Sequence, residues 1–138
     1  MYISTAKRLW LSNNFTLWEF LRTFHGDLIE KQLQIPLEYI NNLQRLCVNV
    51  LQPVRNNFGA VEITSGYRCE ELNNRVGGSP TSDHSKGLAA DFRCQNIEAA
   101  LEFIKNNLEF KQLIDENGLS WIHVSFEAGN NKKQVFKI

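Results

Sequence analysis

Two histidines and one aspartate, His84, Asp91 and His123, have the side chains best suited to chemistry in this sequence. The first two lie in S82-D-H-S-K-G-L-A-A-D91 and the third in W121-I-H-V-S-F126. Two neutral imidazoles and one carboxylate can hold Zn²⁺ while leaving a fourth position open for water. We therefore predict a catalytic zinc site formed by these three residues.

The chain between His84 and Asp91 must turn back if both residues are to bind one ion. In a straight strand the two would lie roughly 23 Å apart, at about 3.3 Å per residue. The segment S85-K-G87 can supply the turn, because Gly87 can take a backbone conformation that is closed to other residues. We expect a short strand over 88–92 to follow and to carry Asp91.

A β-hairpin is predicted to carry His123. Residues 110–126 form two predicted strands around N117-G-L-S120, and Asn-Gly is a strong hairpin signal. An even number of loop residues would place Glu116 on the same face as His123, whereas an odd number would place Asp115 there. A carboxylate beside the metal can take a proton from the nucleophile and give it to the leaving amine. We predict Glu116 as this base, with Asp115 as the alternative.

The N-terminal third is predicted to begin with a short helix over about 17–24. Thr16 and Glu19 have capping-box spacing, and Phe15 is placed to pack against the helix that follows. Three aromatic residues of this part are expected in the core rather than in carbohydrate binding: Trp10, Trp18 and Phe20.

Further along, apolar residues at helical spacing indicate a long core helix that begins at Pro36 and ends within 53–59. A strand is predicted over 61–65, a short helix over 69–76, and an amphipathic helix over 96–105 with its first residue as N-cap. The Asn- and Lys-rich C-terminal tail carries little functional signal.

Composition limits the class of protein. A chain of 138 residues with 43% hydrophobic content fits one domain with its own core. Fifteen residues of each charge sign cancel, which disfavours a nucleic-acid partner. Three unpatterned cysteines argue against a disulfide framework and favour a reducing cytosol, and His25, the third histidine, is expected at the surface.

These observations predict an α+β fold in a single domain over 1–138. N-terminal helices over about 10–58 would pack on a small antiparallel sheet in the zinc-site part, about 60–127. No segment is long and apolar enough to cross a membrane, and the N-terminus lacks the pattern of a signal peptide, so synthesis in the cytoplasm is expected.

Three ordered motifs resemble the zinc D-alanyl-D-alanine carboxypeptidase family, peptidase M15, and its phage-type and short bacterial members in particular. The resemblance spans about residues 10–127, and its motifs are S65-G-Y-R68 with L72-N73 and V76-G-G-S79, then Ser82 to Asp91, then W121-I-H-V-S125.

The resemblance implies a hedgehog/DD-peptidase-like fold in which His84, Asp91 and His123 bind Zn²⁺. It also implies that Arg68 binds the substrate's carboxylate or carbonyl, a role suited to a planar, charged guanidinium, and that Ser82 lines the same pocket. At two positions the sequence leaves a role open or departs from the family pattern. Tyr67 lines the cleft or packs in the core. Ser120 stands where many relatives have an acidic residue, so the assignment of Glu116 depends on the hairpin and on the Q-L-I-x-E pattern from Gln112 to Glu116.

The activity implied is hydrolysis of peptide bonds in the stem peptides of peptidoglycan, as a D-Ala-D-Ala carboxypeptidase or an endopeptidase. A monomer is expected, made in the cytoplasm and acting on the cell wall after release or as part of a phage particle. Two alternatives from other classes are a non-catalytic zinc-binding module and a structural virion component on the same fold.

Overall fold

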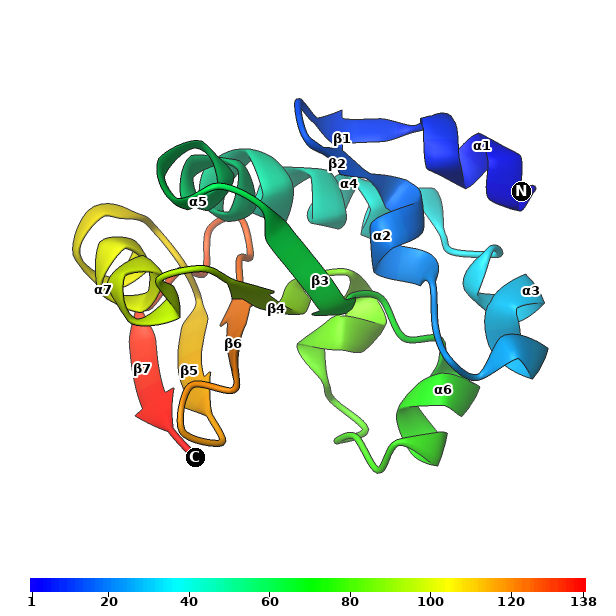
Figure 1. The fold of residues 1–138 in the computed structure, drawn as a ribbon. Coiled ribbons are helices and arrows are strands. Elements are labelled where there is room, and N and C mark those ends of the chain that lie inside the picture. The colour runs from blue at the N-terminus through cyan, green and yellow to red at the C-terminus, as the bar shows by residue number, and fades with distance from the viewer.

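Five strands form the central sheet of the computed structural model, which describes residues 1–138 (Figure 1). Their order is β3-β4-β6-β5-β7. The first four pair antiparallel, and β7 runs parallel to β5. The bounds are Val61–Ser65 (β3), Ala89–Cys94 (β4), Gln112–Glu116 (β5), Trp121–Ser125 (β6) and Gln134–Lys137 (β7).

The predicted α+β fold in a single domain is confirmed, but the sheet is mixed rather than antiparallel because of β7. The C-terminal tail forms this strand, which the sequence analysis did not predict. All four residues of β7 are exposed, so no burial pattern marks the strand in the sequence. Backbone hydrogen bonds hold it instead, including those from Gln134 N to Lys111 O at 3.1 Å and from Ile138 N to Asp115 O at 2.9 Å.

Five helices precede the sheet in the chain, two more lie between its strands, and helices cover one face of the sheet. α5 and α7 contact each other, and each also contacts strands of the sheet (Figure 1). A small hairpin of β1 (Trp10–Ser12) and β2 (Phe15–Thr16) separates the first two helices. The helices are α1 (Ile3–Arg8), α2 (Leu17–Leu21), α3 (Ile29–Gln32), α4 (Leu37–Leu46), α5 (Gln52–Phe58), α6 (Glu70–Arg75) and α7 (Ile97–Asn107), with short 3₁₀ turns at Gly26–Leu28 and Asp83–Lys86.

The predicted long core helix is confirmed as a continuous run of α4, a π-helical turn at Cys47–Leu51, and α5. The π turn comes directly before Pro53. In a regular helix a proline lacks the donor N–H, and its ring clashes with the carbonyl four residues earlier. A wider turn, here with Gln52 N bonded to Cys47 O, lets the helix continue past the proline to Gly59.

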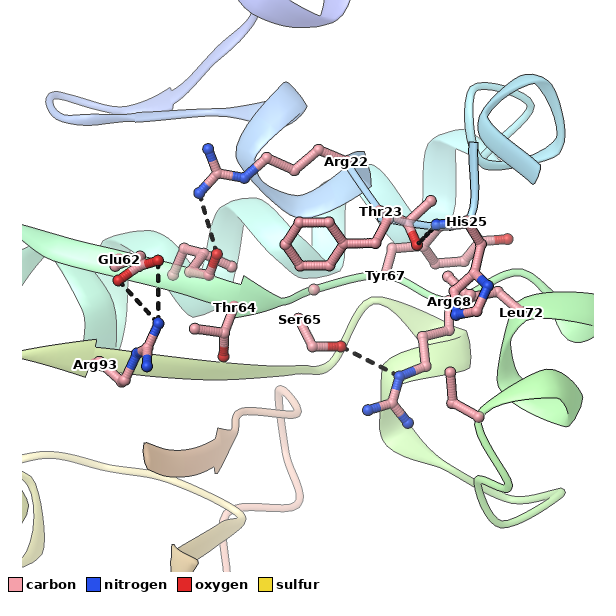
Figure 2. Close-up of a pocket in the computed structure, with 14 residues that line it drawn as sticks. Arg22, Thr23, His25, Glu62, Thr64, Ser65, Tyr67, Arg68, Leu72 and Arg93 are labelled. Carbon is pink, nitrogen blue, oxygen red and sulfur yellow. Dashed lines mark hydrogen bonds and ion pairs between the residues drawn. The ribbon is translucent and has the colours of Figure 1, made fainter. Parts of the chain in front are cut away.

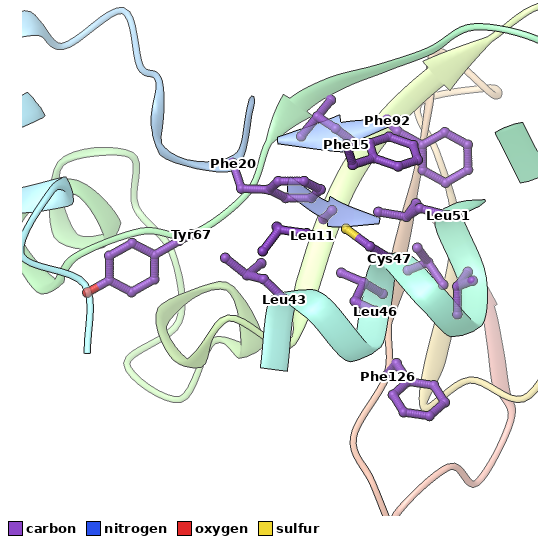
Figure 3. Packing of buried hydrophobic residues seen from close by; sticks show 14 of the residues in the cluster. Leu11, Phe15, Phe20, Leu43, Leu46, Cys47, Leu51, Tyr67, Phe92 and Phe126 are labelled. Carbon is purple, nitrogen blue, oxygen red and sulfur yellow. The ribbon is translucent and has the colours of Figure 1, made fainter. Parts of the chain in front are cut away.

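The capping box predicted for α2 is confirmed, with Thr16 as N-cap and Glu19 at the third helical position. The Glu19 carboxylate accepts from the Thr16 backbone N–H at 2.7 Å. Phe15 packs on Phe20, with ring centroids 6.1 Å apart, as the N-terminal staple requires (Figure 3). Helix α2 ends at Leu21, earlier than the predicted residue 24.

One local prediction is wrong. Trp10 is 60% exposed rather than in the core, because it lies on a two-stranded hairpin with no layer above it. Asn96 is the N-cap residue of α7, as predicted, but it has the left-handed conformation, with φ of 54°, and its side chain makes no capping hydrogen bond. Its backbone carbonyl instead accepts from Ala100 N at 2.9 Å.

The core is one apolar cluster between the helices and the covered face of the sheet (Figure 3). Phe92, Ile122, Val124 and Leu113 are fully buried on that face. Phe20 is buried as predicted, and Trp18 packs at the edge of the cluster. The three cysteines, Cys47, Cys69 and Cys94, are free. None of the helices has the length and apolarity needed to span a bilayer.

Candidate metal centre

His84, Asp91 and His123 converge on the open face of the sheet. Asp91 on β4 lies directly opposite His123 on β6, so the antiparallel register brings their side chains together. Asp91 Oδ1 lies 2.9 Å from His123 Nδ1 and 3.3 Å from His84 Nε2. All three ligand atoms fall within 4.8 Å of one another, which is close enough for one metal ion.

A short turn presents His84 to this pair. His84 lies on the 3₁₀ turn Asp83–Lys86, where the Ser82 hydroxyl accepts from its backbone N–H at 3.2 Å. Gly87 ends the turn with φ of 69°, in the left-handed region, and a Cβ there would collide with the Tyr39 carbonyl. The predicted turn between His84 and Asp91 is therefore confirmed.

A hydrogen bond at Nδ1 of His84, the ring nitrogen that does not face Asp91, fixes the orientation of the ring. Nδ1 lies 2.7 Å from the carbonyl oxygen of Gly66. Because a carbonyl only accepts, Nδ1 carries a proton and donates it to Gly66 O, and Nε2 is left facing Asp91. Metal-binding histidines commonly have such a backbone partner.

Gly66 can act as that partner because it has no side chain. A Cβ at this position would lie 2.6 Å from the Cα and carbonyl oxygen of Phe20. The close approach also lets Tyr67 N donate to Phe20 O at 2.8 Å. The end of β3 is thus held against α2, and this contact sets the position of the carbonyl that holds His84.

Asp91 carries a negative charge in a nearly closed environment, with only 8% of its surface exposed. Burial by itself raises the pKa of this carboxyl, but the hydrogen bonds with His123 and His84 outweigh it and hold the pKa well below its ordinary value. One carboxylate and two imidazoles form a donor set suited to a divalent transition metal ion. The residues present therefore fit a metal ion, which they can bind as a group.

The hairpin loop contains four residues, 117–120, and Glu116 pairs with Trp121. This even count places Glu116 and His123 on one face, as the sequence analysis preferred, and the Trp121 indole N–H donates to the Glu116 carboxylate. Asp115 points to the other face, where its carboxylate accepts from Leu119 N at 2.7 Å and closes the turn. The shared face is confirmed, while the role of Glu116 as base stays a prediction.

A cavity of about 430 Å³ opens over the cluster, and Glu116, Arg68 and Ser82 line it with the three ligands. Arg68 Nη2 lies 3.6 Å from Asp91 Oδ2, and its Nε donates to Ser65 Oγ at 3.2 Å. Burial lowers the pKa of Arg68, while Asp91 and Glu116 raise it. A guanidinium stays protonated through such shifts, so Arg68 presents a fixed positive charge to the cavity.

Tyr67 lies away from this cavity. Its side chain belongs to the core cluster, is 7% exposed, and packs against Tyr39 with ring centroids 6.1 Å apart. Burial raises the pKa of its hydroxyl to about 12. Of the two roles left open by the sequence, the structure matches packing.

Lys111 also lines the cavity, although nothing in the sequence indicated this position. Its ammonium lies 3.0 Å from Asp83 and 2.9 Å from Glu127, so it connects the His84 turn to the start of β5. Burial lowers the pKa of Lys111, but these two carboxylates raise it more, and the net shift is upward. Its partner Asp83 lies 28 positions away, and no spacing rule indicates such a contact.

A family model for peptidase M15 matches residues 24–125, which include the three candidate ligands, Arg68 and Glu116. The match covers well over half of the chain, and the chain therefore belongs to the peptidase M15 family. Membership implies a metal-dependent hydrolase, in agreement with the cluster on the open face. A search of the curated proteins finds no match to the chain.

Proposed function

We propose that this protein is a zinc-dependent peptidase that hydrolyses peptide bonds in the stem peptides of peptidoglycan. The observation that carries the proposal is the convergence of His84, Asp91 and His123 in a cavity that Glu116 and Arg68 also line. Membership in the peptidase M15 family supports it. The cavity supplies a set of metal ligands, the carboxylate of Glu116 outside that set, and the cation of Arg68, and these groups together meet the needs of peptide hydrolysis.

His84, Asp91 and His123 would hold the zinc ion. Bound Zn²⁺ supplies Lewis acidity, which activates water for attack and polarises the scissile carbonyl. Glu116 takes the proton released in the attack and gives it to the leaving amine. Its carboxylate is oriented for this transfer by the Trp121 indole N–H.

Arg68 would orient the substrate. Its guanidinium is held by Ser65 and by the nearby Asp91, so its planar fork has little freedom to move. A substrate carboxylate or carbonyl can accept from it and so be placed beside the metal ligands. The Ser82 side chain lines the same cavity, although its hydroxyl already accepts from His84 N.

Mass spectrometry of soluble products tests the activity directly. Zinc-loaded protein would be incubated with purified peptidoglycan beside a sample treated with chelator. We expect chelator-sensitive release of alanine or of stem-peptide fragments, and the mass of the product would identify the bond. No release from several wall chemotypes would contradict the proposal and favour a non-catalytic zinc-binding module.

A pair of neighbouring substitutions tests the base. Glu116→Gln removes the proton acceptor but keeps an oxygen for Trp121, so we expect zinc to stay bound and hydrolysis to fall by about 10²- to 10⁴-fold. Asp115→Asn is the matched control, because the amide oxygen can still accept from Leu119 N on the opposite face. Metal content by atomic absorption and hydrolysis by product analysis are the readouts. Loss of hydrolysis in the Asp115 variant alone would move the base to that residue.

A further inference from the structure

A second hollow of about 630 Å³ runs along the outer edge of β3. Residues 22–25, which follow α2, form one wall, and Leu72 and Val76 at α6 lie at one end. β3 is an end strand that pairs only with β4, so its other edge faces this hollow, which we name the β3 groove. Figure 2 shows the Glu62 and Arg93 side chains at one end and Arg68 at the other.

Positive charge exceeds negative charge in the β3 groove. Three arginines line it, Arg22, Arg68 and Arg93, against the single carboxylate of Glu62. Glu62 is paired with Arg93 at 3.3 Å. Arg22 has no carboxylate partner, and one of its guanidinium nitrogens donates to the neutral carbonyl of Ile63 at 3.1 Å (Figure 2). A ligand with a carboxylate would pair with a guanidinium that no group of the protein neutralises.

The groove and the metal cavity share one lining side chain. Arg68 lines both. Ser65, which bonds to Arg68 Nε, and Gly66, whose carbonyl holds His84, also line the groove. An extended peptide that is bound at the metal cavity and contacts Arg68 would therefore have the groove as its nearest neighbouring hollow.

The groove also has an apolar part that has no partner in the protein. Phe24 is fully exposed, with a relative accessibility of 107%, and Val76 is 47% exposed. Both lie at the groove with Leu72. Exposed apolar side chains beside the outer edge of β3, together with an Arg22 guanidinium that has no carboxylate partner, suit an extended peptide with both side chains and carboxylates.

We propose that the β3 groove binds the part of the peptide substrate beyond Arg68, as an extended segment whose free carboxylate pairs with Arg22. This inference rests on the proposed peptidase function and adds a substrate requirement to it. The bond is cut at the metal centre, while an acidic group several residues away sets the affinity.

A comparison of two substrates tests this requirement. Purified wall stem peptides with free carboxyl groups would be compared with the same peptides after chemical amidation of those groups. We expect Arg22→Gln to raise KM by about 10-fold for the free peptides, to change KM little for the amidated ones, and to leave kcat unchanged. Glutamine keeps a donor for the Ile63 carbonyl, so β3 stays capped.

Arg8→Gln is the matched control. Arg8 also bonds to a backbone carbonyl, that of Ser4 at 3.2 Å, but lies on α1 outside the groove. It should leave both KM values unchanged. Equal effects of Arg22→Gln and Arg8→Gln, or the same increase in KM for free and amidated peptides, would overturn the proposed carboxylate contact.

Binding without turnover gives a separate readout. Free stem peptide would be titrated into ¹⁵N-labelled Glu116→Gln protein loaded with zinc. We expect shifts of the Phe24, Thr64 and Ser65 amides, and their loss when Arg22→Gln is added. Shifts confined to the metal cavity, with cleavage intact in the wild type, would overturn the groove alone. Absence of both cleavage and binding in the wild type would overturn the proposed function with it.

Discussion

The two faces of the β4–β6 pair use adjacent residues for opposite purposes. Phe92 and Ile122 point to the helices and are fully buried in the apolar core. Asp91 and His123, one position away on the same strands, point to the open face and meet at 2.9 Å. The alternation of a strand therefore separates residues that stabilise the fold from residues that form the site.

Three polar residues of the site are buried or nearly so. The polar groups on the open face nevertheless have hydrogen-bond partners within the protein. No buried side-chain nitrogen or oxygen lacks a hydrogen-bond partner. Gly66, Ser82 and Ser65 are the supports that hold the rings and the guanidinium in place. Because the two faces use different residues, a substitution on one face should leave the other face largely intact.

The largest effect is expected on the open face, from His123→Ala. Removal of a ligand should weaken metal binding by about 1000-fold or more, because losing only an outer hydrogen-bond partner already costs about 10- to 100-fold. Without added metal, the thermal unfolding midpoint should move by only a few degrees. Isothermal titration with zinc and calorimetry of the chelated protein measure the two quantities. Full metal occupancy in this variant would contradict the ligand assignment.

The next effect is expected on the covered face, from Ile122→Ala. This buried side chain leaves a cavity in the core, so the free energy of unfolding should fall by about 2–5 kcal/mol. The zinc affinity of the folded protein should stay within a few-fold of the wild type. Urea unfolding of the chelated protein and zinc titration at low temperature check this. A large loss of zinc affinity would show that the two faces are coupled.

The smallest effect is expected from Glu127→Gln, whose wild-type carboxylate pairs with the cavity-lining Lys111. A hydrogen bond from Lys111, and a second from Asn130, lower the pKa of Glu127 on folding. A carboxyl with a lowered pKa adds stability above its unfolded pKa, about 4.3, and loses that contribution as the pH falls through its folded pKa. The variant should therefore be less stable by about 0.2–1 kcal/mol at pH 7, and the difference should shrink as the pH falls toward 3.

Urea unfolding at both pH values measures this difference. Glu30→Gln is the control, because Glu30 is exposed and has no ion-pair partner. If Glu127→Gln were as destabilising at pH 3 as at pH 7, the contact with Lys111 would not be the cause.

The site could be predicted from sequence where the chain itself fixes the geometry. A loop of four residues between β5 and β6 determines that Glu116 shares a face with His123, and the Asn-Gly pair marks that loop. Gly87 marks the turn that brings His84 back toward Asp91. In both cases a local rule of backbone geometry decides which way a side chain points.

Local rules failed where tertiary contacts decide the structure. β7 has no buried residue, so only its backbone bonds to β5 show that it is a strand. Lys111 acquires its role from two carboxylates that come from other segments of the chain. Gly66 gave no sign in the sequence of its contact with Phe20, because that approach exists only when α2 and β3 are packed together.

The placement of the ligands on a turn and two strands has a thermodynamic consequence. Positions 84, 91 and 123 come together only after β4 and β6 have paired, so the unfolded chain contains no site of this shape. A metal ion that binds only the native state adds to its stability by mass action, about 2.7 kcal/mol at a free concentration 100 times Kd. Metal binding at this cluster would therefore make the stability of the protein depend on the concentration of free metal, and the metal-free chain would be easier to unfold and to degrade.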